Sequence, residues 1–157
     1  MDHFRYRQSA PAGIKALGVV IAAACLAFIV VAAAAADGDW AILVPILGLL
    51  AGTGLGVGIA LSNLYVSLRH GQLTFGISPL WQRTLDLEDI TAVERIDQVS
   101  PAAFGGIGYR RVPGKKTGLL WNGGPGVVIR TSADESITIV LNNADALADD
   151  LNRSVTG

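Results

Sequence analysis

Two uncharged stretches decide how this chain folds: ALGVVIAAACLAFIVVAAAAA at residues 16–36 and AILVPILGLLAGTGLGVGIAL at residues 41–61. Each is about as long as the roughly 20 residues that a helix needs to cross the hydrocarbon core of a bilayer. An acidic turn, Asp37-Gly38-Asp39, separates them and is followed by Trp40, a residue type that favours membrane interfaces. We therefore predict a transmembrane hairpin over residues 16–64, with helices at about 16–36 and 41–64.

A cleaved signal peptide is the alternative for the first stretch. Basic residues precede it, and Ala34–Ala36 would satisfy an Ala-x-Ala cleavage rule. The apolar core of a signal peptide is about 7–15 residues long, which is shorter than residues 16–36, and a second apolar stretch follows at once. The pattern therefore favours a hairpin that stays in the mature protein.

Basic residues flank the hairpin on both outer sides but are missing from its loop. Arg5, Arg7 and Lys15 precede it, and Arg69 and Arg83 follow it. Segments rich in Lys and Arg stay on the cytoplasmic side of a membrane. We therefore expect a multi-pass protein of the cell (inner) membrane, with residues 1–15, both termini and the domain at 65–157 in the cytoplasm.

The second helix carries five glycines on two faces. Gly48, Gly52 and Gly56 recur every four residues, and Gly54 and Gly58 form a second pair on a neighbouring face. Small residues at this spacing let helices approach closely in lipid. One face would pack on the alanine-rich first helix, and the other would be available to another membrane protein or to a second copy of the chain. Neither span contains Asp, Glu, Lys, Arg or His, which argues against transport.

The rest of the chain has the composition of an ordinary soluble domain. From Val66 onward it carries nine Lys and Arg against ten Asp and Glu. Nucleic acids are bound mainly through clustered basic residues, so a near-neutral domain is not expected to bind them. The single cysteine, Cys25, cannot form an internal disulfide and is expected to pack as a small apolar residue.

Short alternating runs, separated by Gly, Pro, Asn and Asp, predict seven β-strands in this domain. They lie at residues 65–70, 72–77, 91–99, 108–112, 117–121, 126–131 and 136–141. Asn142 and Asn143 then supply an N-cap for a short amphipathic helix at Ala144–Arg153, whose apolar residues recur at helical spacing.

Seven strands followed by one closing helix is the element order of the pleckstrin-homology (PH) superfold. Together with GQLTF at 71–75, FGGIGYR at 104–110 and the Asn-capped helix, this order resembles the small two-span bacterial membrane proteins that carry a PH-like domain. The resemblance implies an α+β membrane protein with two nearly orthogonal sheets and a C-terminal helix plugging one open end. It implies little about function, because one fold hosts many roles, and other small β-barrels remain alternatives.

The basic residues of the domain cluster around Val112-Pro113-Gly114. They are Arg110, Arg111, Lys115 and Lys116. Near a bilayer, each basic residue at the surface contributes about 1 kcal/mol of attraction to anionic headgroups. The competing interpretation is a hairpin tip exposed to solvent. PH-type domains that bind phosphoinositides use basic residues around their first hairpin, where this chain offers only Arg69 and His70.

No motif for catalysis or for cofactor binding is apparent in the sequence. A phosphate-binding loop needs Gly-Lys followed directly by Ser or Thr, whereas Gly114-Lys115 is followed by Lys116. His3, His70 and the carboxylates do not have metal-ligand spacing. We expect no enzyme, no metal and no cofactor. The leading hypothesis is an accessory or scaffold protein that binds a membrane protein through its glycine-rich helix and PH-like domain. The alternative is a membrane-surface sensor that binds anionic lipid through the basic turn.

Overall fold

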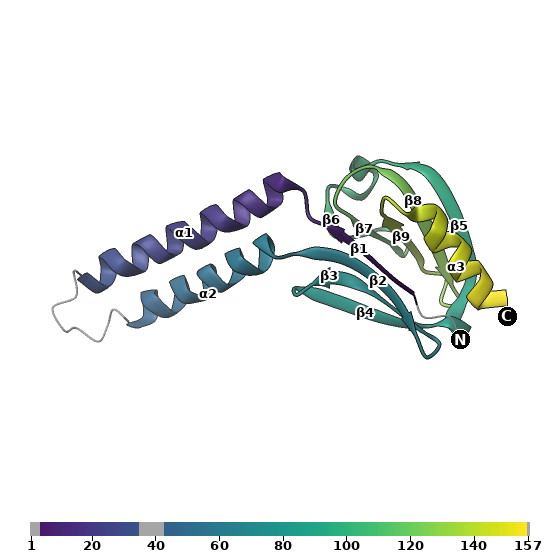
Figure 1. Ribbon diagram of the computed structural model, residues 1–157, viewed down its shortest axis with the longest axis horizontal. Coiled ribbons are helices and arrows are strands. Elements are labelled where there is room, and N and C mark those ends of the chain that lie inside the picture. The colour runs from purple at the N-terminus through teal and green to yellow at the C-terminus, as the bar shows by residue number, and fades with distance from the viewer. Residues whose placement is uncertain (1–3, 35–42, 157) are drawn as a thin grey trace. The chain divides into compact units, whose positions relative to one another are not determined.

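The structure is a computed structural model that describes residues 4–34 and 43–156. The predicted acidic turn and Trp40 lie outside these residues. The chain divides into two compact units. One is helical and spans Ala10–Ser62, and the other combines the residues before Ala10 with those from Asn63 onward. Figure 1 labels their helices and strands.

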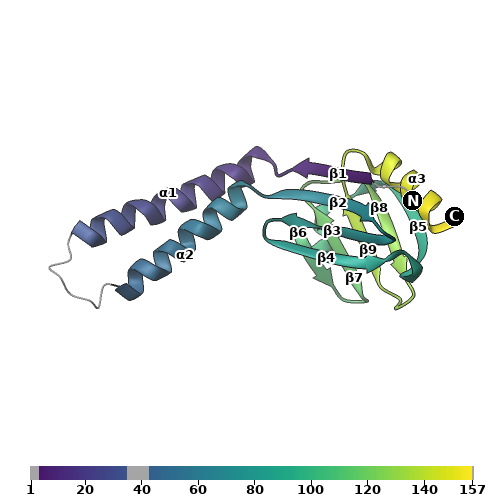
Figure 2. The ribbon, with the colours of Figure 1, turned by 60° about the horizontal axis from the view of Figure 1, so that its bottom comes forward.

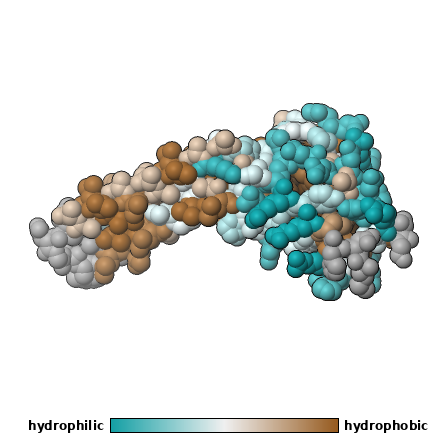
Figure 3. Space-filling view, viewed as in Figure 1, coloured by the Kyte–Doolittle hydropathy of each residue, from teal (hydrophilic) through white to brown (hydrophobic). Residues whose placement is uncertain are grey.

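The helical unit is a pair of packed helices, α1 (Ala12–Ala34) and α2 (Leu43–Ala60). Their side chains are predominantly hydrophobic on the face seen in Figure 3, and most of the large ones are exposed. Of the helices that the structure describes, α1 is the one long and apolar enough to cross a membrane, a property that it shares with signal sequences. Helix α2 is equally apolar but shorter.

Both helices begin or end away from their predicted bounds. Helix α1 starts at Ala12 rather than residue 16, because the carbonyl of Pro11 accepts hydrogen bonds from the backbone amides of Ile14 and Lys15. Helix α2 ends at Ala60, four residues before the predicted end at 64. Its last turn closes when the hydroxyl of Ser62 donates to the carbonyl of Ile59 at 2.7 Å. Hydropathy alone does not locate either boundary, because it ignores backbone hydrogen bonds.

The first sheet has the strand order β1-β2-β3-β4, and all its neighbours are antiparallel. The strands are β1 (Phe4–Ser9), β2 (Asn63–Arg69), β3 (Gln72–Ser78) and β4 (Trp81–Asp86). The predicted hairpin between β2 and β3 is present. Its two-residue turn, His70-Gly71, has positive φ at both positions, the conformation that matches the twist of antiparallel strands.

The second sheet has the order β5-β8-β9-β7-β6, in which β7 and β9 run parallel and the other neighbours antiparallel. Its strands are β5 (Ile90–Val99), β6 (Gly108–Val112), β7 (Lys116–Leu120), β8 (Gly124–Thr131) and β9 (Ser136–Val140). Short helical turns, η2 (Leu87–Asp89) and η3 (Pro101–Phe104), flank β5. Helix α3 (Ala144–Thr156) ends the described chain and contacts β5 and β8. In Figure 2 the strands of the two sheets cross.

One hydrophobic core lies between the sheets and beneath α3. Alternate residues of β2 and β3 are fully buried, and so are residues of β7, β8, β9 and one face of α3. The largest of these side chains are Leu64, Leu73, Phe75, Leu119, Leu120, Ile129, Ile137, Ile139, Leu147 and Leu151. Burial of a side chain of this size contributes about 1.5–3 kcal/mol. An α+β fold with a closing C-terminal helix, as predicted, is therefore confirmed.

All seven predicted strands exist within a few residues of their expected bounds, and the described residues hold two more, β1 and β4. Strand β4 buries only Leu85, and β1 has no fully buried side chain, so neither shows a hydrophobic pattern. The segment at 1–15 was expected to be a simple flank of the hairpin. Residues Phe4–Ser9 of that segment instead form the edge strand of the first sheet.

Candidate functional site

The glycines of α2 separate into a packed set and an open set. A Cβ atom on Gly56 would lie 2.7 Å from the backbone nitrogen of Ala22 and 2.7 Å from the carbonyl oxygen of Gly18. A Cβ on Gly52 would lie 2.9 Å from the Sγ of Cys25. No side chain fits at Gly56, so these glycines provide the close approach of α2 to α1.

Of the other three glycines predicted to contact a helix, two are open and one is buried. Nothing lies within 4 Å of a Cβ placed on Gly48 or Gly54, and both residues are exposed. Gly58, which was expected to pair with Gly54, is buried. Leu50 and Leu55, on either side of Gly54, are 51% and 56% exposed. An open apolar surface of α2 therefore centres on Gly54.

Strand β1 is held firmly in the sheet unit although it precedes α1 in the chain. It pairs with β2 along its whole length, from Phe4 opposite Leu68 to Ser9 opposite Asn63. The hydroxyl of Tyr6 donates a hydrogen bond of 2.6 Å to Asp150 on α3. Both ends of the helical unit are thus continuous with neighbouring strands of a single sheet.

Hydrogen bonds of Gln8 tie β1 to the loops of the second sheet. Its amide nitrogen donates to the side-chain oxygen of Asn122 at 3.1 Å, and its amide oxygen accepts from the backbone nitrogen of Asn142 at 2.9 Å. Burial and the hydrogen bond to Asp150 raise the pKa of Tyr6 to about 12.

A half-buried ion pair joins the two sheets. Arg83 of β4 donates two hydrogen bonds, of 2.7 and 2.6 Å, to the two carboxylate oxygens of Glu135, which directly precedes β9. The buried hydroxyl of Thr117 on β7 donates to the same carboxylate at 3.0 Å. The hydrogen bonds from Arg83 hold the pKa of Glu135 below its ordinary value, against the opposing effect of desolvation. Paired in this way, both groups serve to connect the sheets.

The structure brings together only two of the four basic residues predicted to meet lipid headgroups. Arg111 and Lys115 line an open depression of about 500 Å³ beside the β6–β7 turn, and Glu135 lines it too. The ammonium of Lys115 donates to the backbone carbonyl of Ala133 at 2.9 Å. Lys116 is exposed at the start of β7. Because a carboxylate lies in the same depression, its positive charge is partly offset.

Arg110 lies apart from this depression. Its Nε donates to the carbonyl of Ile107 at 3.0 Å, and its guanidinium lies 3.3 Å from a Cβ built on Gly106. The side chain therefore folds back over the loop that enters β6. Residues that are adjacent in a strand point to opposite faces, which separates Arg110 from Arg111.

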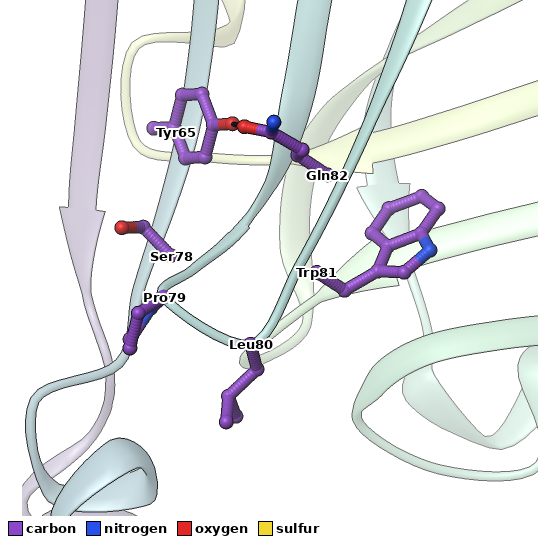
Figure 4. A pocket seen from close by; sticks show the side chains of 6 residues that line it. All are labelled: Tyr65, Ser78, Pro79, Leu80, Trp81 and Gln82. Carbon is purple, nitrogen blue, oxygen red and sulfur yellow. Dashed lines mark hydrogen bonds between the residues drawn. The ribbon is translucent and has the colours of Figure 1, made fainter.

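Aromatic rings gather where the β3–β4 turn meets the start of β6. The rings of Trp81 and Tyr109 are in contact, with centroids 4.0 Å apart and planes tilted by 34°, and Phe75 contacts Trp81 edge-on at 6.2 Å. Beside them, the hydroxyl of Tyr65 donates to the amide oxygen of Gln82 at 2.7 Å, in a pocket of about 430 Å³ (Figure 4). No sequence pattern predicts the pairing of Trp81 with Tyr109, because the two residues belong to different sheets.

The described residues contain no group of three or more His, Cys, Asp or Glu side chains placed to hold a metal ion. The pocket around Tyr65 and Gln82 is lined by Ser78, Pro79, Leu80 and Trp81 as well, and none of these is a general acid or base. Comparison with known proteins adds no assignment. No family model matches the sequence, and a search of curated proteins finds no significant relative.

Proposed function

We propose that this chain is a two-span integral membrane protein whose sheet unit is a PH-like domain in the cytoplasm, and that it acts as a non-enzymatic accessory or scaffold protein. In this proposal the helix pair binds another membrane protein, or a second copy of the chain, through the open surface of α2.

The pairing of β1 with β2 carries the membrane part of this proposal. Strand β1 ends at Ser9, three residues before α1 begins, and β2 starts at Asn63, three residues after α2 ends. Paired strands cannot lie on opposite sides of a hydrocarbon core about 30 Å thick. If α1 crosses the bilayer, the chain must cross back before Asn63, and α2 is the apolar helix available for this. Cleavage of a signal peptide after Ala36 would remove β1 from its sheet.

The orientation of the hairpin follows from charge. Arg5 and Arg7 on β1 and Lys15 on the first turns of α1 come before the apolar part of the hairpin in the chain, and Arg69 on β2 comes after it. The positive-inside rule places these flanking residues, and with them the sheet unit, in the cytoplasm.

The PH-like character is supported by the two crossing sheets and by the helix that ends the described chain. Strands β2, β3 and β4 form an antiparallel meander, a second sheet follows, and α3 covers β5 and β8. Strands β1 and β4 are additions to the expected seven strands, and the second sheet contains one parallel pair, β7 with β9. The fold by itself assigns no role.

The open surface around Gly54 supports partner binding. Within the chain, α2 already uses Gly52 and Gly56 to approach α1. At Gly48 and Gly54 the backbone is equally bare but meets nothing. In lipid, association of helices depends on such close approach, because there is no hydrophobic driving force between apolar surfaces.

A substitution series tests this function in the full chain. Tagged protein carrying Gly54→Leu is purified in mild detergent, and the proteins that copurify with it are quantified by mass spectrometry. Leucine fits at this exposed position, so we expect an intact fold and a loss of the partner or of the dimer. Gly13→Leu, at another open glycine near the start of α1, is the matched control and should retain binding.

The same series separates loss of folding from loss of binding. Gly56→Leu places a side chain against the backbone of Ala22 and should disrupt the helix pair itself. A wild-type protein that purifies alone as a monomer, together with an unchanged Gly54→Leu variant, would contradict the accessory role.

A further inference from the structure

Two exposed apolar side chains stand out in the sheet unit. Among its described residues, the large hydrophobic side chains that remain exposed are Leu80, at 47%, and Ile107, at 39%. Leu80 lies at the tip of the β3–β4 turn and points away from the strands, while Trp81 points to the other side of the turn (Figure 4). The other large apolar residues of the described sheet unit are all less exposed than these two, so this exposure is selective.

The loops that carry these residues are neighbours in space. Trp81 directly follows Leu80, and Tyr109 lies two residues after Ile107. The rings of Trp81 and Tyr109 contact each other, with centroids 4.0 Å apart, and so join the two loops. We call the surface formed by Leu80, Trp81, Ile107 and Tyr109 the apolar rim. Single exposed hydrophobic residues are common, but a set that combines aliphatic tips with half-buried Trp and Tyr is typical of membrane interfaces.

The apolar rim lies at the end of the first sheet where the chain passes to and from the helices. Asn63, the first residue of β2, pairs with Ser9 on one side and with Ser78 on the other. Ser78 immediately precedes the turn that carries Leu80. Only two residues separate Asn63 from the end of α2, and a residue extends the chain by at most about 3.6 Å. The β3–β4 turn is therefore on a short covalent tether to the helix pair.

The second loop has a backbone conformation that glycine favours, and it leaves Ile107 39% exposed. Gly105, Gly106 and Gly108 have φ of 71°, 130° and 91°, values that other residues adopt only with strain. Between them, Ile107 projects outward, and Arg110 lies over the loop with its Nε on the carbonyl of Ile107. A basic side chain beside an exposed aliphatic one is suited to a surface with anionic groups above an apolar layer.

Charge around the rim favours the same surface. The sequence has no acidic residue between Arg69 and Leu85, nor between Gln98 and Ala133. Arg110 is therefore not opposed by a carboxylate from either rim loop, unlike Arg111 and Lys115, which share their depression with Glu135.

We infer that the apolar rim rests on the lipid bilayer, with Leu80 and Ile107 inserted at the headgroup boundary and Arg110 contacting anionic lipid phosphates. This inference rests on the proposed two-span topology. It places the lipid contact on the β3–β4 turn and the loop before β6, and leaves the basic β6–β7 turn in solvent. The rim thereby fixes how the domain sits on the membrane.

Depth-dependent quenching in the full chain tests the inference. With Cys25→Ser as background, single cysteines replace Leu80, Ile107, Leu26 or Glu88, and each carries an environment-sensitive fluorophore in vesicles of phosphatidylcholine and phosphatidylglycerol with brominated chains. Leu26 is exposed on α1 and reports insertion of the helices. Glu88 follows β4 at the far end of the same sheet and is the solvent control.

We expect quenching at positions 80, 107 and 26 but not at 88. Arg110→Gln should weaken the equilibrium constant for contact between the apolar rim and the bilayer by about fivefold, since one basic residue near a surface contributes about 1 kcal/mol. More phosphatidylglycerol should then be needed to reach the same quenching at positions 80 and 107. Lys115→Gln is the matched control and should have no effect.

The outcomes separate this inference from the proposed function. Quenching at 26 without quenching at 80 and 107 would refute the rim contact and leave the two-span topology standing. Absence of quenching at 26 as well would refute both. A response to Lys115→Gln equal to that of Arg110→Gln would assign the contact to the basic turn instead.

Discussion

Among the ion pairs of the described sheet unit, the one between Arg83 and Glu135 should contribute most to the free energy of unfolding. The Arg83 and Glu135 side chains are 28% and 15% exposed, and two hydrogen bonds of 2.7 and 2.6 Å join them. Hydrogen bonds to charged groups contribute about 1.5–3 kcal/mol, whereas fully exposed ion pairs contribute about 0–1 kcal/mol. Partial exposure screens this pair, so we expect Glu135→Gln to lower the free energy of unfolding by about 1–2 kcal/mol.

Glu135→Ala should cost more, because it also leaves the buried hydroxyl of Thr117 without its acceptor. An unsatisfied buried hydroxyl adds a penalty of about 1–3 kcal/mol, so the total is about 3 kcal/mol. For a domain of this size, 1 kcal/mol shifts the melting temperature by about 4–8 °C. Tryptophan fluorescence of the detergent-solubilised chain during heating measures these shifts.

A matched control and a thermodynamic cycle isolate the pair. Glu94, exposed and 3.5 Å from Arg130, should lose less than about 1 kcal/mol on replacement by Gln. The double variant Arg83→Gln/Glu135→Gln should lose less free energy of unfolding than the two single variants added together. Each single variant leaves the other partner's charge unpaired, whereas the double variant removes both charges. If Glu135→Gln costs no more than Glu94→Gln, the role assigned to this ion pair is wrong.

The same pair makes stability depend on acid pH. Because the hydrogen bonds from Arg83 lower the pKa of Glu135 in the folded protein, their contribution is fully present above the unfolded value of about 4.3. It is lost as pH falls through the lower folded-state value. The melting temperature of the wild type should therefore fall more steeply below pH 4.3 than that of Glu135→Gln.

Three further predictions concern the first sheet. Burial and the hydrogen bond to Asp150 together raise the pKa of Tyr6 to about 12, so the neutral phenol should stabilise the fold below the unfolded value of about 10, and this stabilisation should be lost as pH rises from 10 to 12. Tyr6→Phe should remove this alkaline loss in a pH series of melting temperatures. Gly76→Ala should strongly lower the free energy of unfolding, because its Cβ would lie 2.7 Å from the Cα of Gln82 on the neighbouring strand. A melting temperature within 2 °C of the wild-type value would contradict this, since for a domain of this size it corresponds to a loss of less than about 0.5 kcal/mol. Deletion of residues 1–9 uncovers the edge of β2 and should cause aggregation, whereas replacement of residues 10–62 by Asn-Gly should give a soluble domain with β1 and β2 joined by a tight turn; size-exclusion chromatography distinguishes these outcomes.

Local sequence patterns predicted much of the fold because they report burial directly. The alternation of Val66 and Leu68 with polar neighbours marks a strand with one buried face, and the spacing of Leu147 and Leu151 marks a helix with one apolar side. Strand β1 escaped prediction because FRYRQS is polar and its partner lies more than fifty residues away. Pairing of this kind depends on backbone hydrogen bonds rather than on hydrophobic side chains.

Candidate contact residues were harder to predict for a similar reason. Glycine spacing grouped Gly48 with Gly52 and Gly56, but only the packing of α2 on α1 shows which of them are already covered. Likewise Arg110 and Arg111 are adjacent in the sequence, yet one folds over the loop at Ile107 and the other lines the depression with Glu135. The opposite sides of a strand separate neighbours that a charge cluster in the sequence joins.

The sequence by itself determined the two apolar helices, most of the strands and the closing helix, because each depends on the periodicity of a single segment. Tertiary structure alone decided that β1 pairs with β2, that Gly54 stays open while Gly56 is packed, and that the contact of Trp81 with Tyr109 joins the loops of Leu80 and Ile107. These features arise where segments far apart in the chain come together. Their energies depend on distances between segments, which no local pattern encodes.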